Sequence, residues 1–318
     1  MLLQNLKVEI RPMSLSINTN TSSMVALETL NATQTALSAT ENAVSTGKKV
    51  ATAEDSPASY GIAAQMQGNI SGQSAVNDGL TFAAKVVSNS DSAANNILSV
   101  LNNVQQAVTS LGNNDTSTTS LSQLNDELSG FFEQIDSIAG GATINGVNLL
   151  SGSASATNTL YAGMSTTGTS MAYVTALSGQ RSTLAGFGSI TGTAGTTFSA
   201  TGSTFSSMLG LSATTFITGG TALAGSLTDL VKNVQDAITN VTKFTSKLGA
   251  ASQTIASLSS FGTTLSDNLT AGVGALTDAD MSAESAKLTS LQTKQSLAIK
   301  SLTIANGQSQ NILSLFQG

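Results

Sequence analysis

The segment LTDLVKNVQDAITNVTKFTSKLGAASQTIASLSSFGTTLSDNL, residues 227–269, decides the fold of this chain. Its apolar residues recur at steps of three and four, a heptad pattern that is broken at Gly262 and continues for about six repeats. The series comprises Leu227, Leu230, Val234, Ala237, Val241, Phe244, Leu248, Ala251, Ile255, Leu258, Leu265 and Leu269. We expect a helix of roughly 60 Å at 1.5 Å per residue, whose apolar seam needs partner helices.

The first half of the chain supplies such partners in two further heptad runs. Their residues are Ile97, Leu101, Val104, Val108 and Leu111, then Leu121, Leu124, Leu128, Phe131, Ile135 and Ile138. The turn-forming segment GNNDTSTT separates the two runs. Ser120 and Gln123 form a capping-box signature, which predicts that the second helix starts there.

The two ends of the chain carry weaker heptads that contain polar residues. Near the start they are Leu27, Leu30, Leu37 and Val44, and near the end Leu288, Leu291, Ala298, Leu302, Ala305 and Ile312. Thr277 and Asp280 are candidate caps of the last helix. Such helices are marginal alone, so we expect them to be frayed in the monomer and to order on assembly.

The middle of the chain has a different composition. From Ser151 to Ala224, Arg181 is the only charged residue, and Ser, Thr, Gly and Ala dominate. Asn145-Gly146 is a hairpin-turn signal, so we expect a β-hairpin near 140–175 followed by a small β-rich lobe. Scattered apolar residues favour a folded lobe over the alternative, a flexible linker of low complexity; they include Tyr161, Tyr173, Val174, Phe187 and Phe216.

The composition of the 318 residues excludes several classes of function. There is no Cys and no His, which removes disulfides, Cys/His zinc sites and the Ser-His-Asp triad. The net charge is −6 and 9% of residues are charged, so no basic face for nucleic acid is expected. The acidic pairs, Glu54–Asp55, Asp126–Glu127 and Asp278/Asp280, are local neighbours best explained as helix-start charges or solvated faces. We expect no enzyme, cofactor or metal.

The N-terminal stretch does not have the features of a targeting segment. Residues 1–12, MLLQNLKVEIRP, contain Glu9 and Arg11 and lack a cleavable signal pattern. No apolar run reaches the ~20 residues of a membrane helix, so membrane insertion is not expected. Met13 is an alternative native start, with residues 1–12 as an extension.

Four motifs in order resemble bacterial flagellins. They are MSLSINTN from Met13, LSATENAVSTGKKV from Leu37 with AEDSPASYGIA from Ala53, INGVNLL from Ile144, and NILSLF from Asn311. The resemblance covers about 13–150 and 225–318. It implies a filament subunit whose ends pair as an inner core, whose adjacent helices form a rod and whose middle projects outward. It also implies unfolded export through the flagellar type III channel to the cell exterior, with an export chaperone, a filament cap and hook-junction proteins as partners.

We therefore expect a mainly α fold with a small β-rich insert, in which the N- and C-terminal helices pair as a long coiled-coil rod. The expected domains are an extension (1–12), inner-core helices (13–47 with 283–318), a helical rod (48–150 with 225–282) and an outer β-prone domain (151–224). The predicted self-assembly residues are Leu15, Ile17, Leu27, Leu30, Leu37, Val44, Leu302, Ile312, Leu313, Leu315 and Phe316.

A loop between the inner and outer layers is predicted at Lys48, Lys49, Glu54 and Asp55. Two interpretations of its lysines stay open: an intersubunit contact, or a basic spot at a helix end favoured by the macrodipole.

Two features depart from the family pattern. Many flagellins carry a patch with two arginines and a leucine that an animal Toll-like receptor recognises. Here Asn102, Val104 and Gln106 occupy those places within Val100–Ser110, so we expect weak recognition or none.

The insert matches no known pattern, and its Ser/Thr content suits O-glycosylation or simply a polar surface. Alternatives to a flagellin are a hook–filament junction protein and a helical cell-surface protein that binds glycans.

Overall fold

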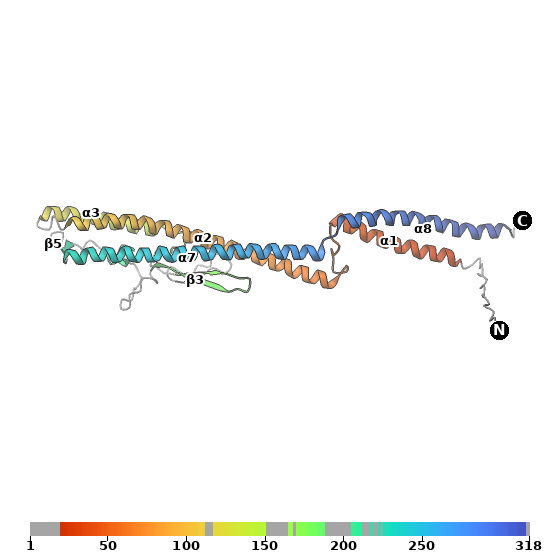
Figure 1. Ribbon diagram of the computed structural model, residues 1–318, viewed down its shortest axis with the longest axis horizontal. Helices are drawn as coiled ribbons and strands as arrows, with labels where there is room; N and C mark the ends of the chain where they lie inside the picture. Colours follow the sequence, from red (N-terminus) through yellow and green to blue (C-terminus); the bar gives the residue numbers. More distant parts are fainter. Residues whose placement is uncertain are drawn as a thin grey trace, which may run out of the picture. The chain divides into compact units, whose positions relative to one another are not determined.

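The protein is described here by a computed structural model (Figure 1). The structure describes residues 20–111, 117–150, 165–167, 170–187, 205–211, 217–218, 222–223 and 225–315, with the backbone alone at 165–167, 207–208, 218, 222–223 and 308–315. The long helices are α1 (Thr21–Thr46), α2 (Pro57–Leu111), α3 (Thr118–Gly141), α7 (Leu227–Thr277) and α8 (Met281–Leu315). The short elements are β1 (Ser165–Thr167), β2 (Ser170–Val174), β3 (Arg181–Ala185), α5 (Phe205–Met208), β4 (Ile217–Thr218) and β5 (Ala222–Leu223).

The chain divides into two compact units. Unit 1 comprises Met1–Met66 and Ala271–Gly318, and unit 2 comprises Gln67–Thr270. Unit 1 therefore brings together the two ends of the chain, and unit 2 contains its middle. Helices α2 and α7 each contribute residues to both units.

Unit 2 is a bundle of α2, α3 and α7 around one apolar core (Figure 1). The predicted heptads supply it: Leu101, Leu128 and Phe244 are each fully buried. Leu, Val and Ala on three helices interdigitate along the seams, as in coiled coils. The expected mainly α fold with a helical rod and a small β-rich insert is confirmed.

Helix α2 is much longer than its heptad run predicted. It begins at Pro57, a residue whose fixed φ and missing N–H suit the first helical position, and continues for 55 residues. The start of α3 also differs from the prediction. The cap is Ser117, whose side chain accepts from the Ser120 backbone N–H. It is not Ser120, because the helix begins at Thr118, three residues earlier than a cap at Ser120 would place it.

The β structure lies further along the chain than the hairpin signal suggested. Asn145 and Gly146, at φ 53° and 83°, form a two-residue turn that carries only the bridge between Ile144 and Val147. The sheet is instead β1-β2-β3, antiparallel throughout, and β4 pairs with β5. In β2–β3 the register places Met171 opposite Leu184, and both side chains are buried.

The described part of the insert packs onto the helices of unit 2. The Phe187 ring lies 5.5 Å from that of Phe244 on α7 and 4.6 Å from that of Phe205 on α5. Asp136 of α3 accepts from the Ser206 backbone N–H and hydroxyl at 2.6 and 2.9 Å. These contacts favour the folded-lobe interpretation for the described segments, whereas Tyr161 and Phe216 lie outside them.

Candidate functional site

The candidate site in unit 1 is the pair formed by α1 and α8, which lie side by side (Figure 1). The pair is antiparallel. At one end Asn20 Nδ2 donates to the Ala305 carbonyl at 2.9 Å, and Ser23 Oγ donates to Asn306 Oδ1 at 2.8 Å. At the other end the Ala279 backbone N–H donates to the Gly47 carbonyl at 2.9 Å. Hydrogen bonds thus fix both ends of the pair.

The seam between the two helices contains few large apolar side chains. Its buried residues are Ala26, Thr33, Leu37 and Thr40 on α1 and Leu291, Ala298 and Ala305 on α8. Small residues let two helices approach closely, but each buries little apolar area. The Thr40 hydroxyl is buried and has no hydrogen-bond partner in the described part of the chain, which weakens the seam further.

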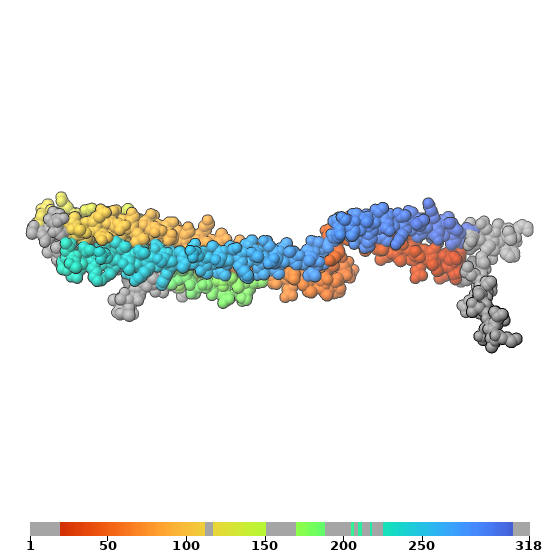
Figure 2. Space-filling view, viewed as in Figure 1, coloured from red at the N-terminus to blue at the C-terminus, as the bar shows by residue number. Residues whose placement is uncertain are grey.

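The outward faces of the pair carry large apolar side chains. On α1, Met24 and Val25 are 65% and 61% exposed. On α8, Leu297 and Ile304 are 60% and 68% exposed, and they lie seven residues apart on one face of the helix. A pair with a thin internal seam and apolar outer faces has the composition of an interaction surface. Figure 2 shows α1 in red and α8 in blue.

The predicted assembly residues occupy three kinds of position. Leu37 is buried in the seam, and Leu30, Val44 and Leu302 are half-buried. Leu27 is 48% exposed, because the seam passes through Ala26 instead. The side chains of the remaining six lie outside the described residues: Leu15, Ile17, Ile312, Leu313, Leu315 and Phe316. The prediction omitted Asn20, although an Asn directly before a helix is a recognisable N-cap signal.

The predicted loop joins α1 to α2 and contacts the segment that joins α7 to α8. Gly47 ends α1 with φ 70°, the left-handed conformation that glycine adopts without strain. The backbone N–H groups of Lys49 and Val50 both donate to the Thr277 carbonyl, at 2.8 and 3.2 Å. The backbones of Lys48 and Asp278 form an isolated antiparallel β-bridge. Two chain segments more than two hundred residues apart in sequence are therefore joined here.

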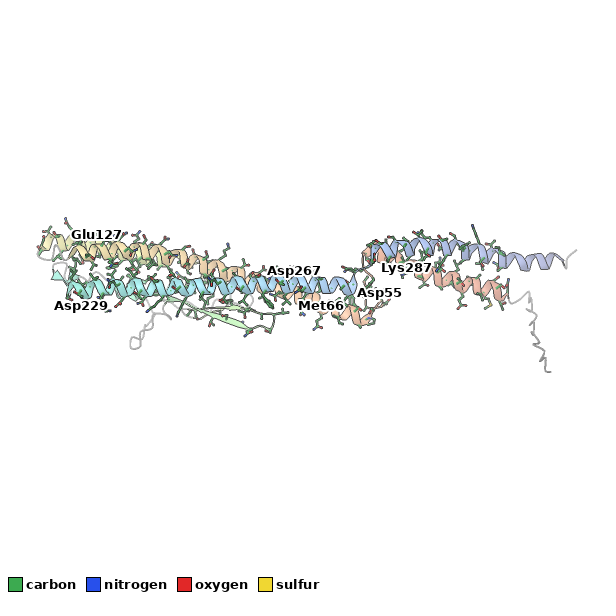
Figure 3. All side chains as sticks on the ribbon, viewed as in Figure 1. Asp55, Met66, Glu127, Asp229, Asp267 and Lys287 are labelled. Atoms are coloured by element: carbon green, nitrogen blue, oxygen red, sulfur yellow. The ribbon has the colours of Figure 1, made fainter. Side chains whose placement is uncertain are left out.

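The charged residues of the loop differ in their contacts. Lys49 Nζ donates to the Ala275 carbonyl at 3.0 Å, at the C-terminal end of α7, where a cation is favoured. Asp55 Oδ2 accepts from the Ala51 and Thr52 backbone N–H groups, both at 2.9 Å. The hydrogen bonds from the backbone of Thr52 and Ala51 lower the pKa of Asp55. Glu54 is exposed, and Figure 3 labels Asp55 in this loop.

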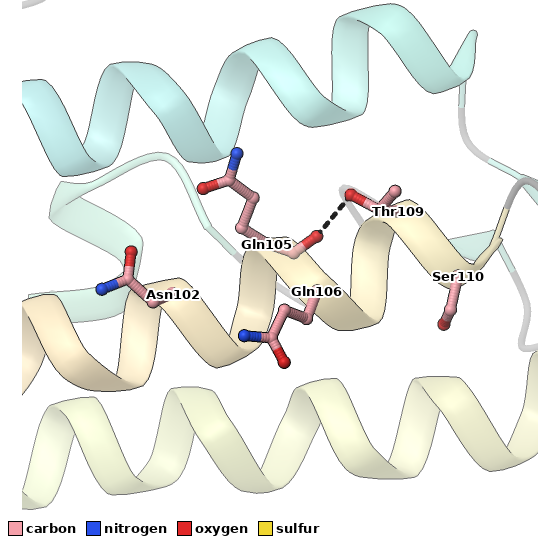
Figure 4. Close-up of a pocket in the computed structure, with 5 residues that line it drawn as sticks. All are labelled: Asn102, Gln105, Gln106, Thr109 and Ser110. Atoms are coloured by element: carbon pink, nitrogen blue, oxygen red, sulfur yellow. Dashed lines mark hydrogen bonds between the residues drawn. The ribbon is translucent and has the colours of Figure 1, made fainter.

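The structure offers little that resembles an active site. Among the described residues there is no group of three or more acidic side chains placed to hold a metal ion. Asn102, Gln105, Gln106, Thr109 and Ser110 line an open hollow beside α2 (Figure 4). Its lining is amides and hydroxyls, and Thr109 Oγ1 donates to the Gln105 carbonyl at 2.7 Å. No helix in the described part of the chain has the length and hydropathy needed to span a membrane.

Comparison with known proteins identifies both ends of the chain. Residues 17–155 match the bacterial flagellin N-terminal helical region, and residues 231–316 match the bacterial flagellin C-terminal helical region. A flagellin of Brucella melitensis is 32% identical over 95% of this chain and 99% of its own length. Flagellin FljK of Caulobacter vibrioides is 30% identical over 95% of this chain and 98% of its own length.

A third relative, Flagellin C of Rhizobium meliloti, is 31% identical over 95% of this chain and 99% of its own length. The two matched regions contain the five long helices almost completely. They therefore include both the core of unit 2 and the α1–α8 pair. The chain belongs to the bacterial flagellin family.

Proposed function

We propose that the α1–α8 pair is the segment through which this flagellin binds its neighbours in the filament, and that the pair becomes fully stable only there. One observation carries this proposal: the pair exposes large apolar side chains, among them Val25 and Ile304, while its own seam is built from small and polar residues. Neighbouring copies that cover those side chains would add the apolar burial that the seam lacks.

As a flagellin, the chain is a structural subunit of the bacterial flagellar filament and self-assembles into it. Flagellins are structural proteins, so the expectation that the chain is not an enzyme is confirmed by the family. The relatives that match nearly the whole chain are flagellins. The two alternatives, a hook–filament junction protein and a glycan-binding surface protein, are therefore not favoured.

The contrast between the two units supports coupling of folding to assembly. Unit 2 has a continuous apolar core that includes Leu80, Val104 and Phe244, all fully buried. In the described part of unit 1, the α1–α8 seam has Leu37 and Leu291 as its large buried apolar side chains. Ordering a helix costs about 1–2 kcal/mol per residue in backbone entropy. The pair therefore depends most on contacts made in the filament.

The export route and its partners are a further part of the proposal. We propose that the chain is secreted unfolded through the flagellar export channel, with a chaperone, and assembles outside the cell beneath a filament cap, on hook-junction proteins. The absence of cysteine and the thin α1–α8 seam both suit a chain that must travel unfolded.

We propose further that this flagellin is weakly recognised, or not recognised, by the animal Toll-like receptor for flagellin. Of the three positions placed in the receptor patch, Val104 is fully buried in the core. Asn102 and Gln106 are exposed, but they carry no charge, so the cationic contacts of the receptor patch would be missing. A receptor-binding assay that gave nanomolar affinity would contradict this part.

The test of the assembly proposal is seeded elongation of purified monomer, followed by negative-stain electron microscopy. The full chain should grow long uniform filaments. A chain that lacks residues 306–318 should remain a soluble monomer with unit 2 folded, because it loses the predicted apolar stretch Ile312–Phe316. Long filaments from the truncated chain would contradict the proposal.

A single substitution with a matched control refines this test. Ile304→Asn puts a polar group on the exposed outer face of α8 and should slow elongation strongly. Thr303→Asn changes an exposed residue next to Ile304 that lies about 100° away around the same helix, and it should leave elongation close to that of the unchanged chain. Equal elongation by the two variants would mean that this face is not covered in the filament.

A further inference from the structure

Unit 2 carries opposite charges on two different helices. In α3 the sequence has four acidic residues, Asp126, Glu127, Glu133 and Asp136, and no Lys or Arg. In α7 the only charged residues between Ala237 and Ser266 are Lys243 and Lys247. One helix is therefore purely acidic, and a long stretch of the other is purely basic.

Three of these carboxylates and both ammonium groups are exposed and lack ion-pair partners. Asp126, Glu127 and Glu133 are exposed, and so are Lys243 and Lys247. In the described part of the chain the ion pairs are Lys232–Asp236 and Lys287–Glu284, and none involves these five residues. Asp136 differs, because it holds Ser206 by two hydrogen bonds.

Within one copy, neither ion pair of the described residues joins α3 to α7. In the close-up the ribbon of α2 is drawn between those of α7 and α3 (Figure 4). An α-helix with its side chains is about 10–12 Å wide, and a salt bridge needs its charged atoms within about 4 Å. The carboxylates and the ammonium groups therefore remain available to a partner.

Each set is arranged so that one partner helix can reach it. Asp126 and Glu133 are seven residues apart, which is two helical turns, and so share a face of α3. Lys243 and Lys247 are four residues apart on α7 and line an open hollow together with Thr239, Thr242 and Ser246. A long flexible lysine side chain can adjust its position, so Lys243 and Lys247 together can reach two carboxylates that are about 10 Å apart along a helix.

We propose that the acidic face of α3 in one copy docks against the Lys243–Lys247 face of α7 in the next copy of this chain. The proposal rests on the proposed function, since it requires that copies assemble. The two complementary surfaces lie on different helices of one molecule, which allows a head-to-tail contact between successive copies. Contacts of this kind do not close on themselves and can propagate into an open helical polymer. Complementary charge would also fix which faces meet.

The test uses charge reversal with mutual rescue. One variant is Lys243→Glu/Lys247→Glu, and the other is Asp126→Lys/Glu133→Lys. Each turns an attraction into a repulsion, so each alone should raise the critical monomer concentration for seeded elongation about tenfold at low salt, equivalent to about 1.4 kcal/mol per contact. The effect should shrink at high salt, because the Debye length falls to about 3 Å at 1 M.

Two rescue experiments separate the specific contact from net charge. A chain with all four substitutions has the original net charge and should elongate like the unchanged chain. A mixture of the two double variants should form filaments that contain both, since each then presents the complement of the other. The control Lys232→Glu/Asp236→Lys inverts an internal ion pair and should have no effect.

The outcomes are distinguishable. If the unchanged chain fails to elongate, the assembly proposal itself fails. If the unchanged chain elongates and either double variant elongates equally well at low salt, this inference is wrong. Failure of both rescues, with the variants folded by circular dichroism, would also overturn it, because the defect would not then come from a pairing of these faces.

Discussion

A carbon added at Gly262 would collide with two polar side chains of α2 in the core of unit 2. A Cβ at this buried position would lie 2.3 Å from Asn77 Oδ1 and 2.5 Å from Gln73 Nε2. These two atoms belong to a hydrogen bond of 3.2 Å between the side chains. Gln73 is only 4% exposed, so its amide cannot swing into solvent. We therefore predict that Gly262→Ala breaks this bond.

The magnitude follows from two opposing effects. Alanine is favoured over glycine inside a helix by about 1 kcal/mol. Against this, the lost hydrogen bond and the buried amide left without a partner cost about 2–3 kcal/mol. The expected net effect on unit 2 is a destabilisation of about 1–2 kcal/mol, derived from these same two contributions.

Gly249 on the same helix provides the control. It is exposed, and a Cβ there would have no neighbour within 4 Å, so Gly249→Ala should stabilise by about 1 kcal/mol. The assay is thermal unfolding of monomer by circular dichroism at 222 nm. The two variants should differ by roughly 5–10 °C in Tm. If Gly262→Ala raises Tm as much as Gly249→Ala, the side chains of Gln73 and Asn77 do not pack over Gly262.

Three further predictions concern single residues. Gly47→Ala should destabilise the C-terminal end of α1 by about 1–2 kcal/mol, because φ is 70° at this residue. The rate of amide hydrogen exchange near Thr46 should therefore rise, and an unchanged rate would argue against the left-handed cap. Ser90 is fully buried and its hydroxyl has no partner among the described residues, so Ser90→Ala should stabilise unit 2 by roughly 1 kcal/mol in urea unfolding; a loss of stability would show that the hydroxyl is satisfied. The pKa of Asp55 is lowered, so the carboxylate stabilises the loop at neutral pH, and this stabilisation is lost only as pH falls through the lowered folded-state pKa. The NMR shifts of the Ala51 and Thr52 amides should therefore titrate with a midpoint below the ordinary Asp value of about 3.9. A midpoint at or above that value would contradict the hydrogen bonds.

The sequence predicts helices well where large apolar residues follow the heptad, and poorly where small residues do. The runs that contain Leu101, Leu128 and Phe244 were found, and each of these side chains is fully buried. The part of α2 before Ile97 was missed because its buried positions include Ala63, Gln73 and Ser90, which interrupt an apolar pattern.

The seam of the α1–α8 pair shows the same limit. An apolar heptad selects Leu27, whereas the buried residues of α1 are Ala26, Thr33, Leu37 and Thr40. Two closely approaching helices favour small side chains at their contact, and a pattern search for leucine cannot see this. The exposed Leu27 then becomes available to another copy, which no single-chain pattern can indicate.

Contacts between distant segments were beyond local patterns. Asp136 and Ser206 are 70 residues apart, and Asn20 and Ala305 are 285 apart. The hairpin signal at Asn145-Gly146 did identify a tight turn with positive φ. It could not show that strand pairing stops after one bridge. Pairing stops there because Val147, Leu149 and Leu150 are buried in the core of unit 2 and do not extend a ladder of strand pairs.

The central claim is that neighbouring copies cover the apolar outer faces of α1 and α8. The most direct test is a cryo-electron microscopy reconstruction of filaments grown from the purified chain. We predict that Met24, Val25, Leu297 and Ile304, each at least 60% exposed in the single chain, lie buried against adjacent subunits. A filament in which these side chains remain open to solvent, with the contacts made only by unit 2, would contradict the claim.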